Sequence, residues 1–197
     1  MKKLIVSLPF LIYYCIAPVN YDKAGIKKGP NFYRGINSAY IKGRYTPFGC
    51  NTSFINYEAY GIQVTAGGYH GFDETQALGG EVSAFLFVKR ETKEPLNMNL
   101  DGYVELFCKL SNPMERSISS VKLGINFPYF FKGEILYGFP NPEKLTLTYS
   151  YLHYNTHSFT LSFILNKNTV ISAGCTKFHG GKYDFYNGYY LGIGIRE

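Results

Sequence analysis

The chain has 197 residues, a formal net charge of +6, 17% charged residues and 18% aromatic residues. So many aromatic residues and so few charges exclude intrinsic disorder. A bundle of membrane-spanning helices is excluded as well, because the chain has no long apolar run after its N-terminus. Gly, Tyr, Phe, Ser and Thr dominate in place of the residues that build helix bundles, so we expect a single all-β domain.

The first residues, 1–17, have the pattern of a secretory signal. Two lysines are followed by an apolar stretch over 4–16, which is too short for a helix that spans a membrane. An uncleaved anchor or a buried first strand is the alternative interpretation. Pro18 makes the cleavage site a poor one, so the start of the mature chain stays open. We predict a signal peptide at 1–17, an N-terminal lead-in segment at 18–36 and one β-barrel domain at 37–197.

Apolar and polar residues alternate along almost all of the remaining chain. In 144–152, for example, Leu145 and Leu147 lie on one face, whereas Thr146 and Thr148 lie on the other. Period two over such lengths predicts β-strands with one apolar face. About nine strands are expected, and a tenth comes either from a short strand at 134–139 or from a division of 52–69. The other ranges are 38–46, 80–90, 103–110, 118–127, 144–152, 158–165, 169–178 and 188–196.

The turns between these strands are mostly short, which requires antiparallel, up-and-down pairing. A last strand as well patterned as 186–196 would leave unpaired backbone groups if it stayed at an edge. We therefore predict a closed barrel of 8–10 strands in which 186–196 pairs with the first strand, near 37–46. An even number of strands makes that pairing antiparallel.

Two barrel types fit the alternation: a soluble barrel with an apolar interior, and a membrane barrel with an apolar exterior. Small or neutral residues on the polar face, strand lengths that suit a tilted membrane crossing, and aromatic residues near the turns favour the membrane barrel. On this interpretation the lipid-facing set includes Leu123, Leu147, Leu161 and Ile193. The inward set includes Thr148, Ser162 and Gly192, together with charges that can pair in a narrow lumen: Glu105, Lys109, Lys122 and Arg196.

With its signal segment, alternating strands, aromatic girdles and Gly-rich hairpins, the chain resembles the small outer-membrane β-barrel proteins of Gram-negative bacteria over roughly residues 30–197. No family-specific motif carries this resemblance. It implies a cell outer-membrane location, with the lipid bilayer and lipopolysaccharide as surroundings. One departure is the end of the chain. Such proteins commonly end their last strand on an aromatic residue, whereas here Glu197 is last and the nearest aromatic residue is Tyr190.

Catalytic signals are sparse. The run His153-Tyr154-Asn155 is similar to the His-x-Ser pair of outer-membrane lipid A deacylases, but Asn155 stands where the nucleophilic serine belongs. Ser158 could replace that serine only across a turn, so His153 and Ser158 are weak catalytic candidates and no enzyme activity is predicted. Three cysteines follow the signal, at 50, 108 and 175, and do not form a disulfide framework. Cys175 with His179 is too small a set for zinc, and no metal or cofactor is predicted.

The leading functional hypothesis is a structural, surface-interaction or narrow-pore barrel. Its partners would bind through loops expected at 70–79, 92–100 and 128–142. A soluble, periplasmic or secreted lipocalin-like barrel that binds an apolar ligand is one alternative, and a lipid-modifying outer-membrane enzyme is another. Basic residues are scattered rather than clustered, so no nucleic-acid partner is expected.

Overall fold

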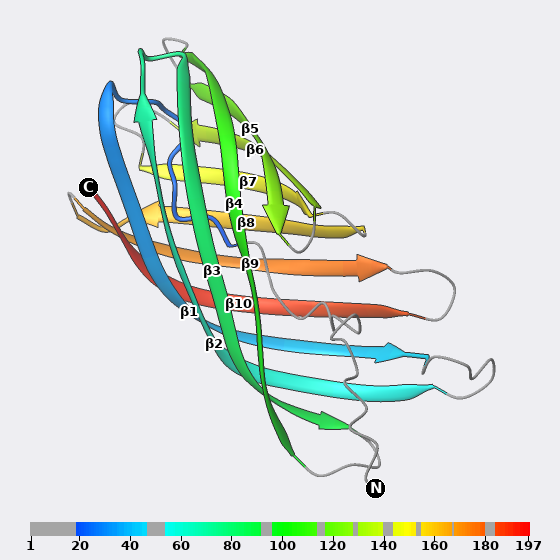
Figure 1. The fold of residues 1–197 in the computed structure, drawn as a ribbon. Coiled ribbons are helices and arrows are strands. Elements are labelled where there is room, and N and C mark those ends of the chain that lie inside the picture. Colours follow the sequence, from blue (N-terminus) through cyan, green and yellow to red (C-terminus); the bar gives the residue numbers. More distant parts are fainter. Residues whose placement is uncertain are drawn as a thin grey trace, which may run out of the picture.

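The computed structural model describes residues 19–46, 54–91, 96–113, 117–127, 130–139, 144–152, 155–166, 168–179 and 184–197. These residues form ten antiparallel strands that close into one barrel (Figure 1). The strands are β1 (Gly29–Tyr45), β2 (Ile55–Gly71), β3 (Gln76–Glu91), β4 (Asn97–Pro113), β5 (Ile118–Phe127), β6 (Phe130–Phe139), β7 (Leu145–Leu152), β8 (Thr156–Ile164), β9 (Thr169–His179) and β10 (Phe185–Arg196). The predicted all-β, up-and-down barrel is confirmed, and its ten strands are the upper end of the expected range of 8–10.

Closure between the first and last strands is also confirmed. β1 pairs antiparallel with β10 over a register that runs from Tyr33 opposite Arg196 to Arg44 opposite Phe185. The tenth strand is β6, whose end coincides with the short stretch expected at 134–139, whereas 52–69 belongs to the single strand β2. β1 begins at Gly29, ahead of position 37, where the sequence placed the start of the barrel. The reason is that 29–36 pairs with β2 although its apolar pattern is weak.

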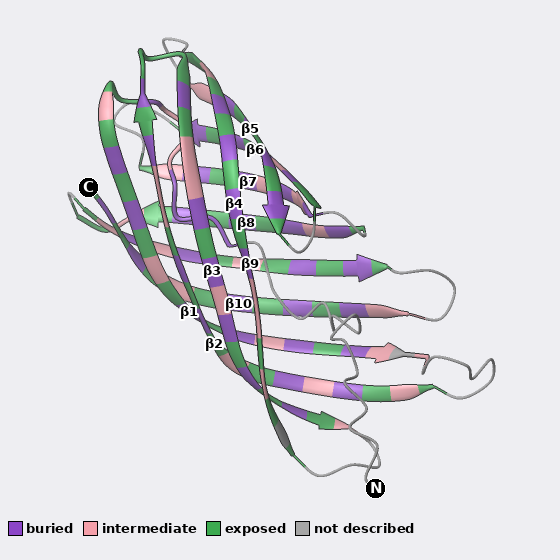
Figure 2. Cartoon of the chain, viewed as in Figure 1, coloured by how far each residue is buried: buried purple, intermediate pink, exposed green. Residues whose placement is uncertain are grey.

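Burial alternates along each strand, as Figure 2 shows by its purple and green bands. The outward faces carry exposed apolar side chains, including Leu123, Leu147, Leu161 and Ile193 as predicted. The inward faces carry Lys122, Thr148 and Ser162, which are buried, and Gly192. An apolar exterior around a polar interior is the arrangement of a membrane-spanning barrel, and it is opposite to that of a lipocalin-like barrel. The soluble-barrel alternative is therefore wrong.

Substituting Leu147 with arginine tests this orientation. Leu147 lies outward in the middle of β7, so a charge there would face hydrocarbon and should cost about 2–4 kcal/mol of folding free energy. Urea unfolding of the protein refolded in lipid vesicles measures the cost. The matched control is Lys144→Arg, which keeps an exposed charge just before the same strand. Equal midpoints for Leu147→Arg and wild type would contradict a lipid-facing β7.

The three loops expected to bind partners are shorter than predicted. Most of 70–79 belongs to β2 and β3, most of 128–142 to β6, and the second half of 92–100 to β4. The tight turn after β2 is held by Asp73, whose Oδ1 accepts hydrogen bonds from the Thr75 hydroxyl at 2.7 Å, from Thr75 N at 2.6 Å and from Gln76 N at 2.8 Å. The hydrogen bonds from Thr75, above all that of its hydroxyl, lower the pKa of Asp73. Because consecutive strands of an up-and-down barrel run in opposite directions, β2 meets β3 at one end of the barrel and β3 meets β4 at the other. The start of β3 in 70–79 and the start of β4 in 92–100 therefore lie toward opposite ends of the barrel.

No helix among the described residues is long and apolar enough to cross a membrane. The segment 1–17, predicted as a signal peptide, lies outside the described residues, as do His153 and Cys50.

Candidate functional site

The segment before β1 lies inside the barrel. Residues 19–28, here called the plug, run through the interior as the blue trace in Figure 1 and then continue into β1. Val19, Asn20, Tyr21 and Asp22 are almost completely buried. The chain turns from plug to strand at Gly29, whose φ of 90° is a conformation that side chains disfavour. A stretch with little secondary structure of its own therefore occupies the lumen.

Small hydroxyl residues of β7, β8 and β9 line the part of the lumen that receives the start of the plug. Asn20 Nδ2 donates a hydrogen bond to Thr148 Oγ1 at 3.1 Å. The backbone oxygen of Asn20 accepts hydrogen bonds from Ser162 Oγ at 3.1 Å and Ser172 Oγ at 3.4 Å. Such short side chains cannot fill the lumen themselves, and the plug fills it in their place. The side-chain hydroxyls in turn satisfy polar groups of the buried segment.

The ring of Tyr21 lies on glycines of the two strands that close the barrel. A methyl group added at Gly35 of β1, or at Gly192 or Gly194 of β10, would lie within 2.5 Å of the Tyr21 side chain. Glycine is therefore needed at these inward positions because the ring approaches the backbone directly. The Tyr21 hydroxyl donates a hydrogen bond to Asn37 Oδ1 at 3.4 Å. The plug thus packs on the seam between β1 and β10.

Asp22 is held by cations from two opposite parts of the wall. Its Oδ2 lies 2.8 Å from Lys109 Nζ of β4, in an ion pair whose two side chains are almost fully buried. The same Nζ donates to the backbone oxygen of Lys23 at 2.6 Å. From β10, Arg196 donates through Nε to the Tyr21 oxygen and through Nη2 to the Asp22 oxygen, the latter at 2.8 Å. The plug is therefore fixed by charge as well as by shape.

A second group of buried charges, here called the ion network, fills the side of the lumen formed by β3–β6. Lys132 Nζ lies 2.6 Å from Glu81, 3.1 Å from Glu105 and 3.4 Å from Glu134. Lys122 Nζ lies 2.7 Å from Glu134 and 3.6 Å from Glu81. All five side chains are almost inaccessible to solvent.

Two tyrosines complete the ion network. Tyr33 and Tyr103 donate hydrogen bonds to the two oxygens of Glu81. Each ring also lies against a lysine, with Lys122 Nζ 5.5 Å from the Tyr33 centroid and Lys132 Nζ 4.9 Å from the Tyr103 centroid. These buried charges act as fixed filling, because removing either lysine leaves buried carboxylates uncompensated.

The four charges predicted for the lumen, Glu105, Lys109, Lys122 and Arg196, all face inward. Lys109 pairs with the plug rather than with Glu105, its neighbour on the same strand. Four further charged residues of the lumen were not predicted as such from the sequence: Asp22, Glu81, Lys132 and Glu134. Period two could have found Lys132, since it shares a strand face with Glu134, but the residue falls in a stretch expected to be a loop.

Of the two weak catalytic candidates, Ser158 lies among the described residues and His153 does not. Ser158 is buried on the inward face of β8, where its Oγ lies 2.9 Å from the Tyr190 hydroxyl and 3.2 Å from the Cys175 oxygen. The neighbouring histidine, His157, lies 2.6 Å from the Tyr149 hydroxyl through its Nδ1. Cys175 is exposed with a free thiol, as is Cys108, and no group of metal-binding residues occurs among the described residues.

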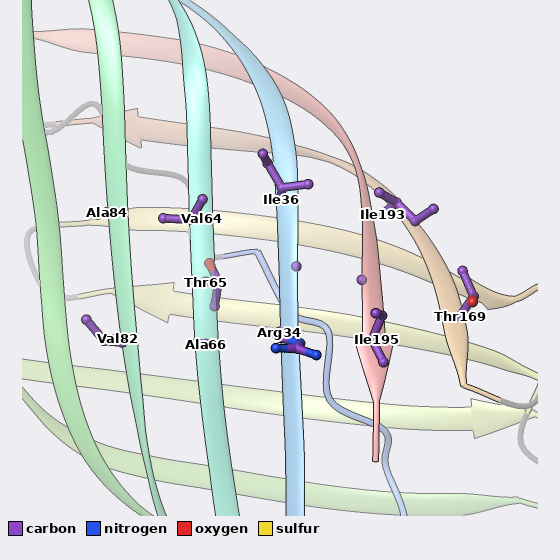
Figure 3. A pocket seen from close by; sticks show the side chains of 12 residues that line it. Arg34, Ile36, Val64, Thr65, Ala66, Val82, Ala84, Thr169, Ile193 and Ile195 are labelled. Carbon is purple, nitrogen blue, oxygen red and sulfur yellow. The ribbon is translucent and has the colours of Figure 1, made fainter.

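The outer surface carries a shallow groove of about 540 Å³ across β10, β1, β2 and β3, with Thr169 of β9 at its edge. Figure 3 shows Ile36, Val64 and Ile193 at one end and Arg34 and Ile195 toward the other. The residues that line it are mostly apolar, and it opens on the outward face rather than into the lumen. It belongs to the apolar exterior that hydrocarbon would cover.

No protein-family model and no curated protein matches this chain. Among solved structures it is similar to an outer membrane channel from Pseudomonas putida F1, at 6% identity and a TM-score of 0.55, over 91% of this chain and 99% of that chain. It is also similar to Ail, the attachment invasion locus protein of Yersinia pestis, at 14% identity and a TM-score of 0.40, over 86% and 99% of the two chains. A third is Neisserial surface protein A, at 11% identity and a TM-score of 0.40, over 85% and 99%. At these identities the likeness concerns the fold, which is that of an outer-membrane β-barrel.

Proposed function

We propose that this chain is an outer-membrane β-barrel of the narrow-pore type, exported by the segment 1–17, whose pore is closed by the plug at 19–28. The observation that carries the proposal is the division of the lumen. The ion network fills one side with side chains of the wall itself, whereas the part of the β7–β10 wall that contacts the plug carries Ser, Thr and Gly and is filled by the plug.

This division argues for a pore rather than a purely structural barrel. A barrel that needs only a solid interior can fill it with large side chains from every strand. Here one part of the wall is hydrophilic and lined by hydroxyls such as Thr148, Ser162 and Ser172, so water would occupy that space once the plug leaves. The shared fold with an outer membrane channel supports the same interpretation.

The double variant Tyr21→Ala/Asp22→Ala tests the proposal in planar lipid bilayers. It removes the ring seated on the glycines and the carboxylate paired with Lys109. Losing a buried aromatic side chain alone should weaken plug seating by about 3 kcal/mol, which is roughly a hundredfold in the closed-to-open ratio. We expect rare openings for wild type and sustained ion conductance for the variant.

Tyr40→Ala is the matched control, since Tyr40 lies on β1 but stacks on Tyr60 of β2 instead of contacting the plug, with 4.7 Å between ring centroids. It should conduct like wild type. A double variant that folds and inserts yet conducts no more than wild type would refute the pore proposal, and the closed barrel would then have a structural role.

A further inference from the structure

We infer that Lys109 and Arg196 form a binding site for small carboxylate anions inside the lumen, and that Asp22 of the plug occupies this site in the closed barrel. The inference rests on the proposed function in one respect: a solute reaches the site only when the plug leaves it. The site itself is visible in the contacts that Asp22 makes.

Both oxygens of the Asp22 carboxylate are engaged. Oδ2 pairs with Lys109 Nζ at 2.8 Å, and Oδ1 accepts a hydrogen bond from the backbone N of Lys23 at 2.8 Å. The side chains of Asp22 and Lys109 are both almost completely buried. A short, buried, charge-assisted contact of this kind is the geometry in which a protein binds a free carboxylate.

Arg196 gives the same place a second cation. Its Nε and Nη2 donate to the backbone oxygens of Tyr21 and Asp22, so the guanidinium reaches the plug beside the Asp22–Lys109 pair. When the plug leaves, the Nε and Nη2 atoms of the planar guanidinium lose these two hydrogen-bond acceptors. Guanidinium forks bind carboxylates through two parallel hydrogen bonds, which makes the vacated site suited to that ligand class rather than to a cation.

The charges that remain in the lumen after the plug leaves also favour the binding of an anion. The three carboxylates of the ion network already share the two lysines Lys122 and Lys132. Lys109 has its ion pair with the plug, and that pair is lost with it. Lys109 then loses the carboxylate that neutralises its charge, and a mobile anion that binds there replaces that carboxylate.

Chemical rescue with acetate tests the site without requiring the pore to open. Asp22→Ala leaves Lys109 buried beside a space of carboxylate size and should lower the unfolding temperature of the protein in detergent micelles. Sodium acetate should then raise that temperature, because a ligand that binds only the folded state stabilises it. Sodium chloride at equal ionic strength is the comparison that removes general salt effects.

Two further variants test whether acetate acts at the Asp22–Lys109 site. Asp22→Ala/Lys109→Met should show no acetate-dependent gain, since the cation is gone. Asn20→Ala, which loses a plug contact of a different kind, should show none either, because Asp22 still occupies the site. An Asp22→Ala protein that acetate does not stabilise more than chloride would overturn the inference.

Ion selectivity measures the site in the open pore. Under a KCl gradient the Tyr21→Ala/Asp22→Ala variant should prefer chloride to potassium, and adding Lys109→Met should bring the reversal potential close to zero. Lys177→Met, on the exposed face of β9, is the control and should leave the preference unchanged. An open pore with the same selectivity with and without Lys109 would refute the anion site while the pore proposal stands. Acetate rescue without conductance would refute the pore proposal alone.

Discussion

Replacing Lys132 with methionine is expected to destabilise the barrel by about 3–5 kcal/mol, because it leaves buried carboxylates without their shared cation. Lys132 is within 3.4 Å of Glu81, Glu105 and Glu134, and all four side chains are buried. Methionine matches the apolar stem of the lysine in length, so the loss reports charge rather than volume. Urea unfolding in lipid vesicles, followed by tyrosine fluorescence, measures it.

Two companion variants make the result specific. Lys177→Met removes an exposed lysine of β9 and should change stability by less than about 0.5 kcal/mol. Lys132→Met/Glu105→Gln removes one negative charge together with the positive one and should recover part of the loss. If Lys132→Met were as stable as wild type, the ion network would not be the fixed filling described above.

Removing residues 186–197 should abolish the barrel rather than trim a tail. β10 pairs with β1 on one side and with β9 on the other, so its loss leaves two long edges of unpaired backbone groups. Lipid offers no partner for them, and each unsatisfied group costs several kcal/mol. The truncated chain should fail to become protease-resistant in vesicles and should not show the gel shift of a folded barrel.

Removal of Glu197 alone is the control for this truncation. It spares all of β10, which ends at Arg196, and costs the backbone hydrogen bonds between Glu197 and Phe32 and an exposed ion pair with Arg34. That protein should insert and resist protease like the full chain. A protein cut before residue 186 that did the same would contradict closure through β10.

Much of the barrel could be predicted from the sequence because period two sorts residues onto two faces. Strands such as β5 and β8 have an uninterrupted pattern, and their faces point as expected. β6 was harder to predict. It begins at Phe130 with a positive φ of 66°, directly after a Pro-Tyr pair that is typical of a loop, so only its second half was expected.

The plug could not be predicted, and the reason is physical. Residues 19–28 have neither a helical nor a strand period, and their burial depends on the wall around them rather than on their own composition. The sequence did show that one face of β10 is rich in glycine and therefore carries unusually small residues. Which side chain rests on Gly192 and Gly194 is a tertiary property, because Tyr21 is distant in the chain.

The position of Tyr21 constrains the order in which this molecule assembles. Its ring rests at once on Gly35, next to the start of the first strand pair, and on Gly194, near the end of the chain. A ring of that size cannot pass between two strands once their hydrogen bonds have formed. In the closed barrel the plug can therefore reach or leave the lumen only through an end of the barrel. Pairing of β1 with β10 completes the surface on which the ring rests, so the seat of Tyr21 exists only once the barrel has closed.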